Sequence, residues 1–247
     1  MKKFFCLIWC LAAVMLFAGE MPVAQEALLF KADFDGSSDA TIANGNDKAG
    51  VRGKIKYADG LKGKALISGE GNALVFYENK DNIDFDKPGS IVFFFKANSD
   101  WHKTPQRGIV MWGLGNQNGY IAIRISNYPK NVCPCRRTFE FLVLNVKGRK
   151  DRVCSLQMPA LKRICRGFHM IAVAWAGDQL FMSCDGQPYR VFKQPRPLSN
   201  ADFATCKRFA VGNVTSNYLI DDFRIYGKKL SDEELQKIWD NSREGGK

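Results

Sequence analysis

An aspartate stands within an apolar strand pattern near the end of the chain. In the stretch NYLIDDFRIY, strand alternation puts Leu219, Asp221, Phe223 and Ile225 on one face. A buried carboxylate must accept hydrogen bonds, pair with a cation or bind a metal ion, since leaving it unpaired costs roughly several kcal/mol. The pattern therefore predicts a specific partner for Asp221.

The chain offers few groups for nucleophilic or acid–base catalysis. Its only histidines are His102 and His169, and a serine or cysteine nucleophile usually needs such a base beside it. His169 belongs to the apolar run FHMIAVAW and is expected to pack on a sheet. His102 lies in SDWHKTP, a polar loop without an evident partner. A serine, cysteine or histidine mechanism is therefore not expected.

Aromatic residues next to amide groups are the candidates for sugar contacts. Trp101 lies in a polar loop beside His102, and MWGLGNQNGY combines an aromatic residue with two asparagines. Trp112, in the apolar part of that stretch, is expected to pack in the core instead. The candidate carbohydrate-binding residues are Trp101, His102, Asn116, Asn118 and Tyr120.

Positive charge is concentrated in one part of the chain. The net charge is +11, and residues 130–208 hold 15 Lys or Arg against 5 Asp or Glu. Such a field attracts polyanions, whereas the alternative interpretation is a solvated surface. Aromatic residues are not interleaved with the basic ones as single-stranded nucleic acid requires, so nucleic acid is not expected as a partner. The candidate polyanion-binding residues are Lys147, Arg149, Lys150, Arg152, Lys162, Arg163 and Arg166.

The first residues have the layout of a secretory signal peptide. Two lysines precede an apolar run from Phe4 to Ala18, which is short for a membrane span, and small residues follow. We expect residues 1–24 to be the signal and residues 25–247 to form one domain. The protein is then secreted or periplasmic, with no transmembrane segment after cleavage.

Six cysteines follow the signal segment, and an even number in an exported chain predicts disulfides. Cys133 and Cys135 are too close in sequence to pair with each other, and the other pairings stay open. The spacings differ from the paired two-residue spacings of zinc ribbons, which makes zinc the minor alternative. The candidates for disulfides are Cys133, Cys135, Cys154, Cys165, Cys184 and Cys206.

Eleven short apolar or alternating runs, separated by polar and Gly-rich breaks, predict a two-sheet antiparallel β-sandwich. The runs are ALLFKADF, NALVFY, SIVFFFKA, RGIVMWGLG, YIAIRISN, FEFLVLNV, FHMIAVAWA, QLFMSC, YRVFK, RFAVG and YLIDDFRIY.

Local signals predict one tight turn and one helix. Asp185 and Gly186 form a dipeptide that favours the two-residue turn of a β-hairpin. Near the end of the chain, Ser231 and Glu234 have the spacing of a capping box. Leu235, Ile238 and Trp239 form an apolar stripe, so this helix is expected to lie against the sandwich.

Four blocks of the sequence together resemble a known superfamily. They are ADFDG, then GLKGKALISGEG with KPGSIVFFFKA, then GFHMIAVAWAGDQLFMSCDG, and finally YLIDDFRIYGKKLSDEEL. In this order they resemble the laminin-G-like members of the concanavalin A-like lectin and glucanase superfamily. The resemblance covers nearly the whole chain after the signal, although residues 127–165 do not match the pattern. It implies an all-β jelly roll with its two ends side by side.

The resemblance also bears on metal binding. The family carries an aspartate at the position of Asp221, and pairing of the first and last strands would bring Asp33 and Asp35 close to it. Carboxylate and carbonyl oxygens suit calcium, so Asp33, Asp35 and Asp221 are the candidates for a structural calcium site. The alternative is that Asp221 accepts backbone N–H groups or an arginine. No cofactor is required in either case.

Catalysis of the glucanase type is not expected. The glucanases of this superfamily carry Glu-x-Asp-x-x-Glu on one strand, and no glutamate in this chain is followed two positions later by aspartate.

The leading hypothesis is a secreted, non-catalytic module that binds carbohydrate, with an anionic polysaccharide as the favoured class. The alternative is a cell-surface or periplasmic module that binds a protein. A glycoside hydrolase is the third hypothesis. It is kept because fold alone does not decide function.

Overall fold

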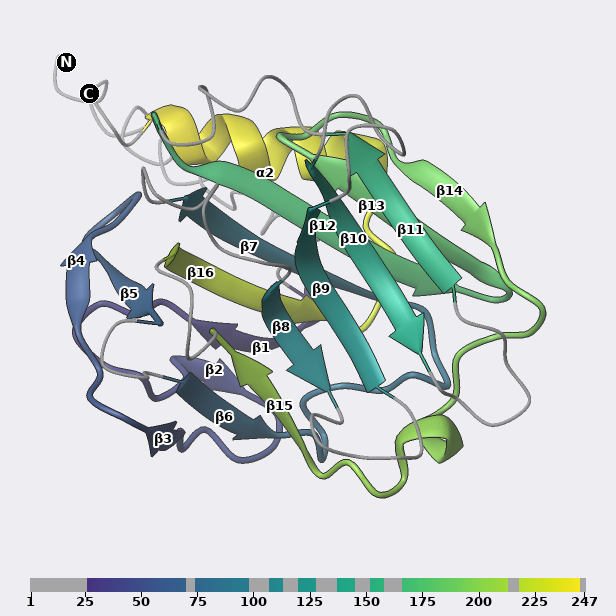
Figure 1. Ribbon diagram of the computed structural model, residues 1–247, viewed down its shortest axis with the longest axis horizontal. Coiled ribbons are helices and arrows are strands. Elements are labelled where there is room, and N and C mark those ends of the chain that lie inside the picture. The colour runs from purple at the N-terminus through teal and green to yellow at the C-terminus, as the bar shows by residue number, and fades with distance from the viewer. Residues whose placement is uncertain are drawn as a thin grey trace, which may run out of the picture.

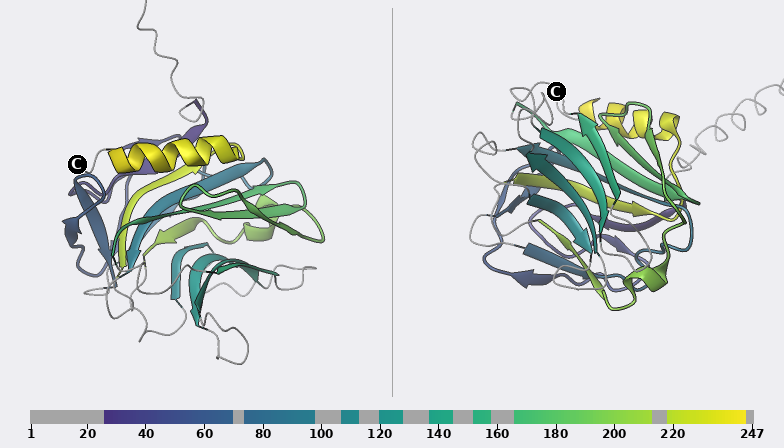
Figure 2. Two further views of the ribbon diagram at one scale, coloured as in Figure 1. Left: turned by 90° about the horizontal axis from the view of Figure 1, so that it is seen from above. Right: turned by 45° about the vertical axis from the view of Figure 1, so that its right-hand side comes forward.

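The computed structural model describes residues 26–69, 74–97, 107–112, 120–127, 137–144, 152–157, 166–212 and 218–244. Two antiparallel sheets form a sandwich, with one α-helix lying across the outer face of the larger sheet (Figures 1 and 2). The predicted signal segment, residues 1–24, lies outside the described residues. No helix in the described ranges is long and apolar enough to cross a membrane.

The larger sheet has nine strands. Seven lie in the order β14 (Arg190–Lys193), β13 (Gln179–Cys184), β12 (His169–Ala176), β7 (Gly89–Ala97), β16 (Tyr218–Tyr226), β1 (Leu28–Ala32) and β2 (Ile42–Ala43). Strand β5 (Lys64–Ser68) also pairs with β16, and β4 (Tyr57–Asp59) pairs with β5. The first and last strands of the described chain, β1 and β16, are therefore neighbours, as the resemblance implied.

The smaller sheet has seven strands. Their order is β11 (Arg152–Gln157), β10 (Arg137–Leu144), β9 (Tyr120–Asn127), β8 (Arg107–Trp112), β15 (Arg208–Val211), β6 (Leu74–Glu78) and β3 (Gly50–Arg52). A 3-10 helix, η3 (Asn200–Phe203), precedes β15, and α2 (Asp232–Glu244) follows β16.

The predicted fold class is confirmed, since the described strands pair in two antiparallel sheets. Each of the eleven predicted runs contains a strand. The prediction omitted β2, β3, β4, β5 and β11. Of these, β2 to β4 have only two or three residues, too few to show an alternating pattern.

Aromatic side chains from both sheets meet in the core between them. Phe30 of β1 packs edge-on against Tyr77 of β6 and Phe209 of β15, with ring centroids 4.7 and 5.4 Å away. Phe209 in turn stacks on Phe223 of β16 at 5.8 Å. All four side chains are at most 1% exposed. Burial of such large rings is a principal source of stability in a sandwich.

Helix α2 covers a second, smaller apolar cluster on the outer face of the larger sheet. Leu230 and Leu235 are fully buried there, next to Val92, Phe94 and other outward-facing residues. Trp239 of the helix stacks on Phe94 at 6.5 Å. The predicted apolar stripe therefore faces the sheet, and β16 is covered on both of its faces.

The capping box and the hairpin turn are both confirmed. The Glu234 amide donates to Ser231 Oγ at 3.2 Å, and the Ser231 amide donates to Glu234 Oε2 at 2.9 Å. Asp185 and Gly186 have positive φ angles of 54° and 70°, and the Gln187 amide donates to the Cys184 carbonyl at 3.1 Å. Both angles fit the mirror-image turn that joins antiparallel strands.

The disulfide prediction is wrong for two of the six cysteines. Neither Cys184 nor Cys206 forms a disulfide. Cys206 Sγ donates to the Arg208 carbonyl at 3.0 Å, and Cys184 lies next to the Asp185 carboxylate. Each of these two thiols thus has a hydrogen-bond acceptor within reach. Cys133, Cys135 and Cys165 lie outside the described residues, as does the side chain of Cys154.

Replacing Ser231 by alanine tests the capping box. The variant loses the acceptor for the Glu234 amide, so the free energy of unfolding should fall by about 1 kcal/mol. Urea denaturation of wild type, Ser231→Ala and the exposed helix variant Gln236→Ala measures the difference. Gln236→Ala should change stability by less than about 0.5 kcal/mol. Equal stability of the two variants would contradict the capping role.

Candidate functional site

A bulge in β16 sends Asp221 to the outer face of the larger sheet. The register with β7 shifts between Asp221 and Arg224, and Asp222 has a positive φ of 47°. Ile220 and Phe223 both point into the core between the sheets. Asp221 lies opposite Phe94, which belongs to the cluster beneath α2. The prediction that Asp221 shares a face with Phe223 and Ile225 is therefore wrong, because a bulge inserts one residue into the alternation.

The Asp221 carboxylate holds the turn that precedes β5. Asp221 Oδ2 accepts the Leu61 amide at 2.7 Å, and the Asp221 side chain is only 2% exposed. Within the turn, the Gly60 amide donates to the Gly63 carbonyl at 3.0 Å. A Cβ atom at Gly60 would clash with Asp221 Oδ2, so the carboxylate requires glycine at this position.

The Asp35 carboxylate binds the other end of the same turn. Its Oδ1 atom accepts the Lys64 amide at 2.6 Å. Gly63 has a positive φ of 63°, and a Cβ atom there would overlap the Asp35 carboxylate. Two aspartates that are far apart in sequence thus clamp the turn of residues 60–64. The two glycines of the GLKGK stretch are explained by this contact.

Burial keeps the Asp221 carboxyl partly protonated at neutral pH. It raises the pKa of Asp221 from 3.8 to about 7. The hydrogen bond from the Leu61 amide opposes this shift, while the charges of Asp222 and Asp35 add to it. An acid with this pKa, close to further carboxylates and inside a pocket, marks a candidate functional site.

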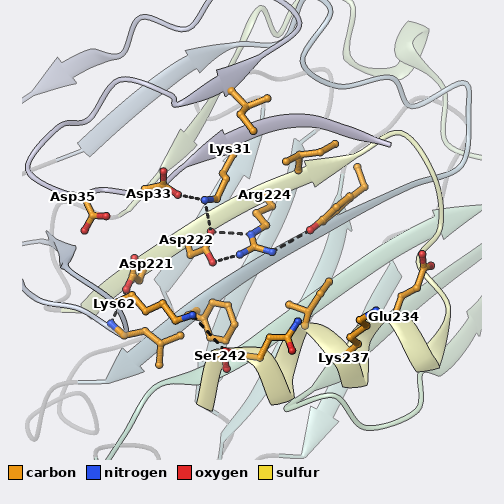
Figure 3. A pocket seen from close by; sticks show the side chains of 17 residues that line it. Lys31, Asp33, Asp35, Lys62, Asp221, Asp222, Arg224, Glu234, Lys237 and Ser242 are labelled. Atoms are coloured by element: carbon orange, nitrogen blue, oxygen red, sulfur yellow. Dashed lines mark hydrogen bonds and ion pairs between the residues drawn. The ribbon is translucent and has the colours of Figure 1, made fainter. Parts of the chain in front are cut away.

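A layer of ion pairs lies beside Asp221 (Figure 3). The Asp222 carboxylate binds the Arg224 guanidinium, whose Nε atom donates to Asp222 Oδ1 at 2.8 Å. Lys31 of β1 pairs with Asp33 and lies 3.7 Å from Asp222 Oδ1. Burial lowers the pKa of Arg224, but the Asp222 carboxylate outweighs burial and raises it overall. The guanidinium therefore remains charged within the pocket wall.

Helix α2 and the 60–64 turn complete a pocket of about 600 Å³ on this face. Lys62 Nζ donates to the Asn241 carbonyl at 3.4 Å, which joins the turn to the helix. Lys237 and Ser242 of the helix line the same wall (Figure 3). Phe94 and Ile238 supply apolar surface. The pocket thus offers carboxylate acceptors, cationic donors and an apolar patch to one ligand.

The structure brings the three predicted calcium ligands to one place. Asp33, Asp35 and Asp221 all line the pocket. Each carboxylate, however, already has a protein partner: Lys31 for Asp33, the Lys64 amide for Asp35 and the Leu61 amide for Asp221. Backbone donation to Asp221 matches the alternative that the sequence left open. Calcium binding itself stays a prediction.

Most of the other predicted site residues are not described. Trp101, His102, Asn116 and Asn118 lie outside the described residues, as do Lys147, Arg149, Lys150, Lys162 and Arg163. Tyr120 begins β9 and Arg152 begins β11, without a description of either side chain. Arg166 is exposed. The carbohydrate and polyanion assignments of these residues stay predictions.

The pocket includes residues that sequence reasoning did not select. Lys31, Lys62, Asp222, Arg224 and Lys237 were not among the candidates, although all of them line it. One signal was available: charged residues recur with a spacing of two at Lys31 in β1 and Asp33 just after it, and at Asp222 and Arg224 in β16. The helix residues could not be placed from sequence, because their position depends on how α2 docks.

Comparisons with known proteins support the fold. No family model matches the chain, and no curated protein matches it in sequence. A botulinum neurotoxin serotype D/C binding domain superposes with a TM-score of 0.68 at 12% identity, covering 89% of this chain and 53% of that one. The serotype D binding domain gives 0.67 at 14%, covering 88% and 52%.

A third similar structure is a serotype DC binding domain in complex with rat synaptotagmin II. It has a TM-score of 0.67 at 14% identity and covers 89% of this chain and 52% of its own. The chain thus spans about half the length of the neurotoxin structures it matches. These domains are β-sandwiches of the jelly-roll kind, and at such low identity the likeness shows the fold alone.

Replacing Asp221 by asparagine tests the buried carboxyl. Between pH 3.8 and about 7 the folded state holds a proton that the unfolded state has released. The contribution of this group to stability is therefore largest below the unfolded pKa and falls as the pH rises to the folded pKa. Asp221→Asn cannot ionise, so its stability should decline less over this range.

Urea denaturation at several pH values between about 4 and about 8 measures this difference. The exposed helix variant Asp240→Asn serves as the control and should keep the wild-type pH dependence. A decline of equal steepness in Asp221→Asn and wild type would show that the Asp221 carboxyl is not the titrating group.

Proposed function

We propose that this chain is a non-catalytic module of the laminin-G-like type that binds carbohydrate at the pocket beneath α2. The observation that carries the proposal is the lining of this pocket, where carboxylates, ammonium groups and a guanidinium surround a small apolar area. Sugar hydroxyls both donate and accept hydrogen bonds, so a mixed set of charged donors and acceptors suits them. Pockets of this size accommodate small-molecule ligands.

An anionic sugar is the favoured class. Lys62 and Lys237 line the pocket and are exposed to solvent, where they are available to a carboxylate or sulfate group. The partly buried Asp222 and Arg224 would then contact the uncharged part of the sugar. The basic residues between positions 130 and 208 add a positive field that attracts such ligands over a longer range.

A role in protein recognition is the second candidate function. The observation that favours it is the similar neurotoxin domain in complex with rat synaptotagmin II, a protein ligand. The pocket beneath α2 would then receive a side chain of a cell-surface protein. Binding to cells that have been treated with protease or stripped of glycans separates the two candidates, since each treatment removes only one kind of ligand.

A glycoside hydrolase is the least supported of the three functional hypotheses. Asp221 has the raised pKa of a general acid, and Asp35 is a second carboxylate nearby. Asp221, however, is almost completely buried, and its Oδ2 atom binds the Leu61 amide. Asp35 likewise binds the Lys64 amide. Both carboxylates thus hold the turn of residues 60–64. Release of reducing sugar from bound polysaccharide would overturn the non-catalytic proposal.

A glycan array at low and high salt tests carbohydrate binding and its location. The double variant Lys62→Gln with Lys237→Gln should lose about tenfold or more in affinity for an anionic glycan, because two charge-assisted contacts disappear. The control is Lys54→Gln with Lys207→Gln, which removes the same charge from exposed positions that do not line this pocket. Wild-type binding should also weaken at high salt.

The outcomes of the array separate the alternatives. Equal loss in both double variants would indicate a general field effect and contradict binding at the pocket. Salt-resistant binding would contradict an anionic ligand and point to aromatic contacts elsewhere. Absence of binding at both salt concentrations would contradict the carbohydrate proposal and favour protein recognition.

A further inference from the structure

A second group of reactive side chains lies away from the pocket, where β12 begins and β13 ends. His169 is the first residue of β12, Cys184 is the last residue of β13, and Asp185 follows in the hairpin turn. The two strands are hydrogen-bonded neighbours (Figure 1). One nitrogen, one sulfur and one oxygen atom of these residues all lie within 4.8 Å of one another.

The surrounding backbone fixes the positions of these side chains. His169 Nδ1 lies 2.7 Å from Asp185 Oδ2, and Asp185 Oδ1 accepts the Met170 amide at 2.9 Å. The Asp185 amide in turn donates to the Met170 carbonyl at 2.9 Å. Asp185 thus bonds to the start of β12 through both its backbone and its side chain. All three residues are partly buried.

The arrangement differs from that of a catalytic triad. In a triad the histidine lies between the nucleophile and the carboxylate. Here Asp185 neighbours both other residues and interacts with Cys184 as well as His169. Burial, followed by the Asp185 charge, raises the pKa of the Cys184 thiol. The thiol is therefore a weaker nucleophile than the thiol of an exposed cysteine.

We propose that His169, Cys184 and Asp185 form a binding site for a divalent transition metal ion, with Zn²⁺ as the preferred ion. Imidazole nitrogen, thiolate sulfur and carboxylate oxygen are the usual zinc ligands, whereas calcium and magnesium take oxygen ligands only. Three protein ligands leave one position of a tetrahedral ion for water or an added ligand.

Binding exchanges a proton for the metal ion. The Cys184 S–H bond breaks, a bond between sulfur and Zn²⁺ forms, and the proton passes to the buffer without any change of oxidation state. The ligand atoms must also approach one another, since zinc bonds are about 2.0 to 2.3 Å long. The bound ion would link the start of β12 to the turn after β13. This site shares none of the residues that line the pocket beneath α2.

Cobalt titration of the purified full-length protein, under a non-chelating reductant, tests the proposal. Co²⁺ occupies zinc sites and gives a thiolate-to-cobalt charge-transfer band when a cysteine coordinates it. Wild type should show this band and lose it on addition of Zn²⁺. Cys184→Ser and His169→Gln should each bind one equivalent of metal less than wild type. Cys206→Ser is the matched control, because Cys206 is also a partly buried cysteine without a disulfide, and it should bind as wild type does.

A second measurement needs no variant and covers the case in which a variant fails to fold. Wild type is alkylated with iodoacetamide with and without Zn²⁺, and mass spectrometry follows the modification of each cysteine. Zn²⁺ should slow alkylation of Cys184 several-fold and leave Cys206 unchanged. Equal rates at Cys184 with and without Zn²⁺, or full retention of metal by a folded Cys184→Ser variant, would overturn the proposal.

Discussion

The contact between the Asp221 carboxyl and the Leu61 amide is the constraint on which the outer face of the larger sheet depends. It places an ionisable group in an almost fully buried position, which is costly unless the group is hydrogen-bonded or protonated. The structure uses both means, since the amide donates to the carboxylate and burial raises the pKa to about 7. Glycine at position 60 follows directly, because the carboxylate occupies the space of a side chain there.

The bulge at Asp222 reconciles this contact with the core. Without an inserted residue, a strand that pointed Asp221 outward would also point Phe223 and Ile225 outward, and the sandwich would lose two buried side chains. With the bulge, Asp221 and Arg224 face α2 while Phe223 and Ile225 remain inside. The ion pairs of Lys31, Asp222 and Arg224 then form one wall of the pocket, and the docked helix forms another.

The sequence was sufficient for the sandwich and the capped helix, because each depends on local patterns. The pairing of the first and last strands followed from the resemblance to the laminin-G-like proteins. The sequence was insufficient for the bulge. The residues before and after the bulge each keep their own alternating pattern, so the sequence does not reveal that the inserted residue changes which of them share a face. The same limit applies to Cys184: an even cysteine count predicted a disulfide, but its true neighbours, His169 and Asp185, are set by strand register. Helix docking likewise decided that Lys237 lines the pocket with Asp221.

A carbon-13 NMR titration of the aspartate carboxyl carbons tests the burial of Asp221 most directly, with the Asp221 signal assigned by comparison with Asp221→Asn. Burial of the carboxyl against the turn predicts a midpoint near pH 7 for Asp221, together with a shift of the Leu61 amide resonance over the same range. A midpoint near 3.8, the value of an exposed aspartate, would show that the carboxyl is solvated and is not buried against the turn. The origin of the bulge and of the pocket would then need another explanation.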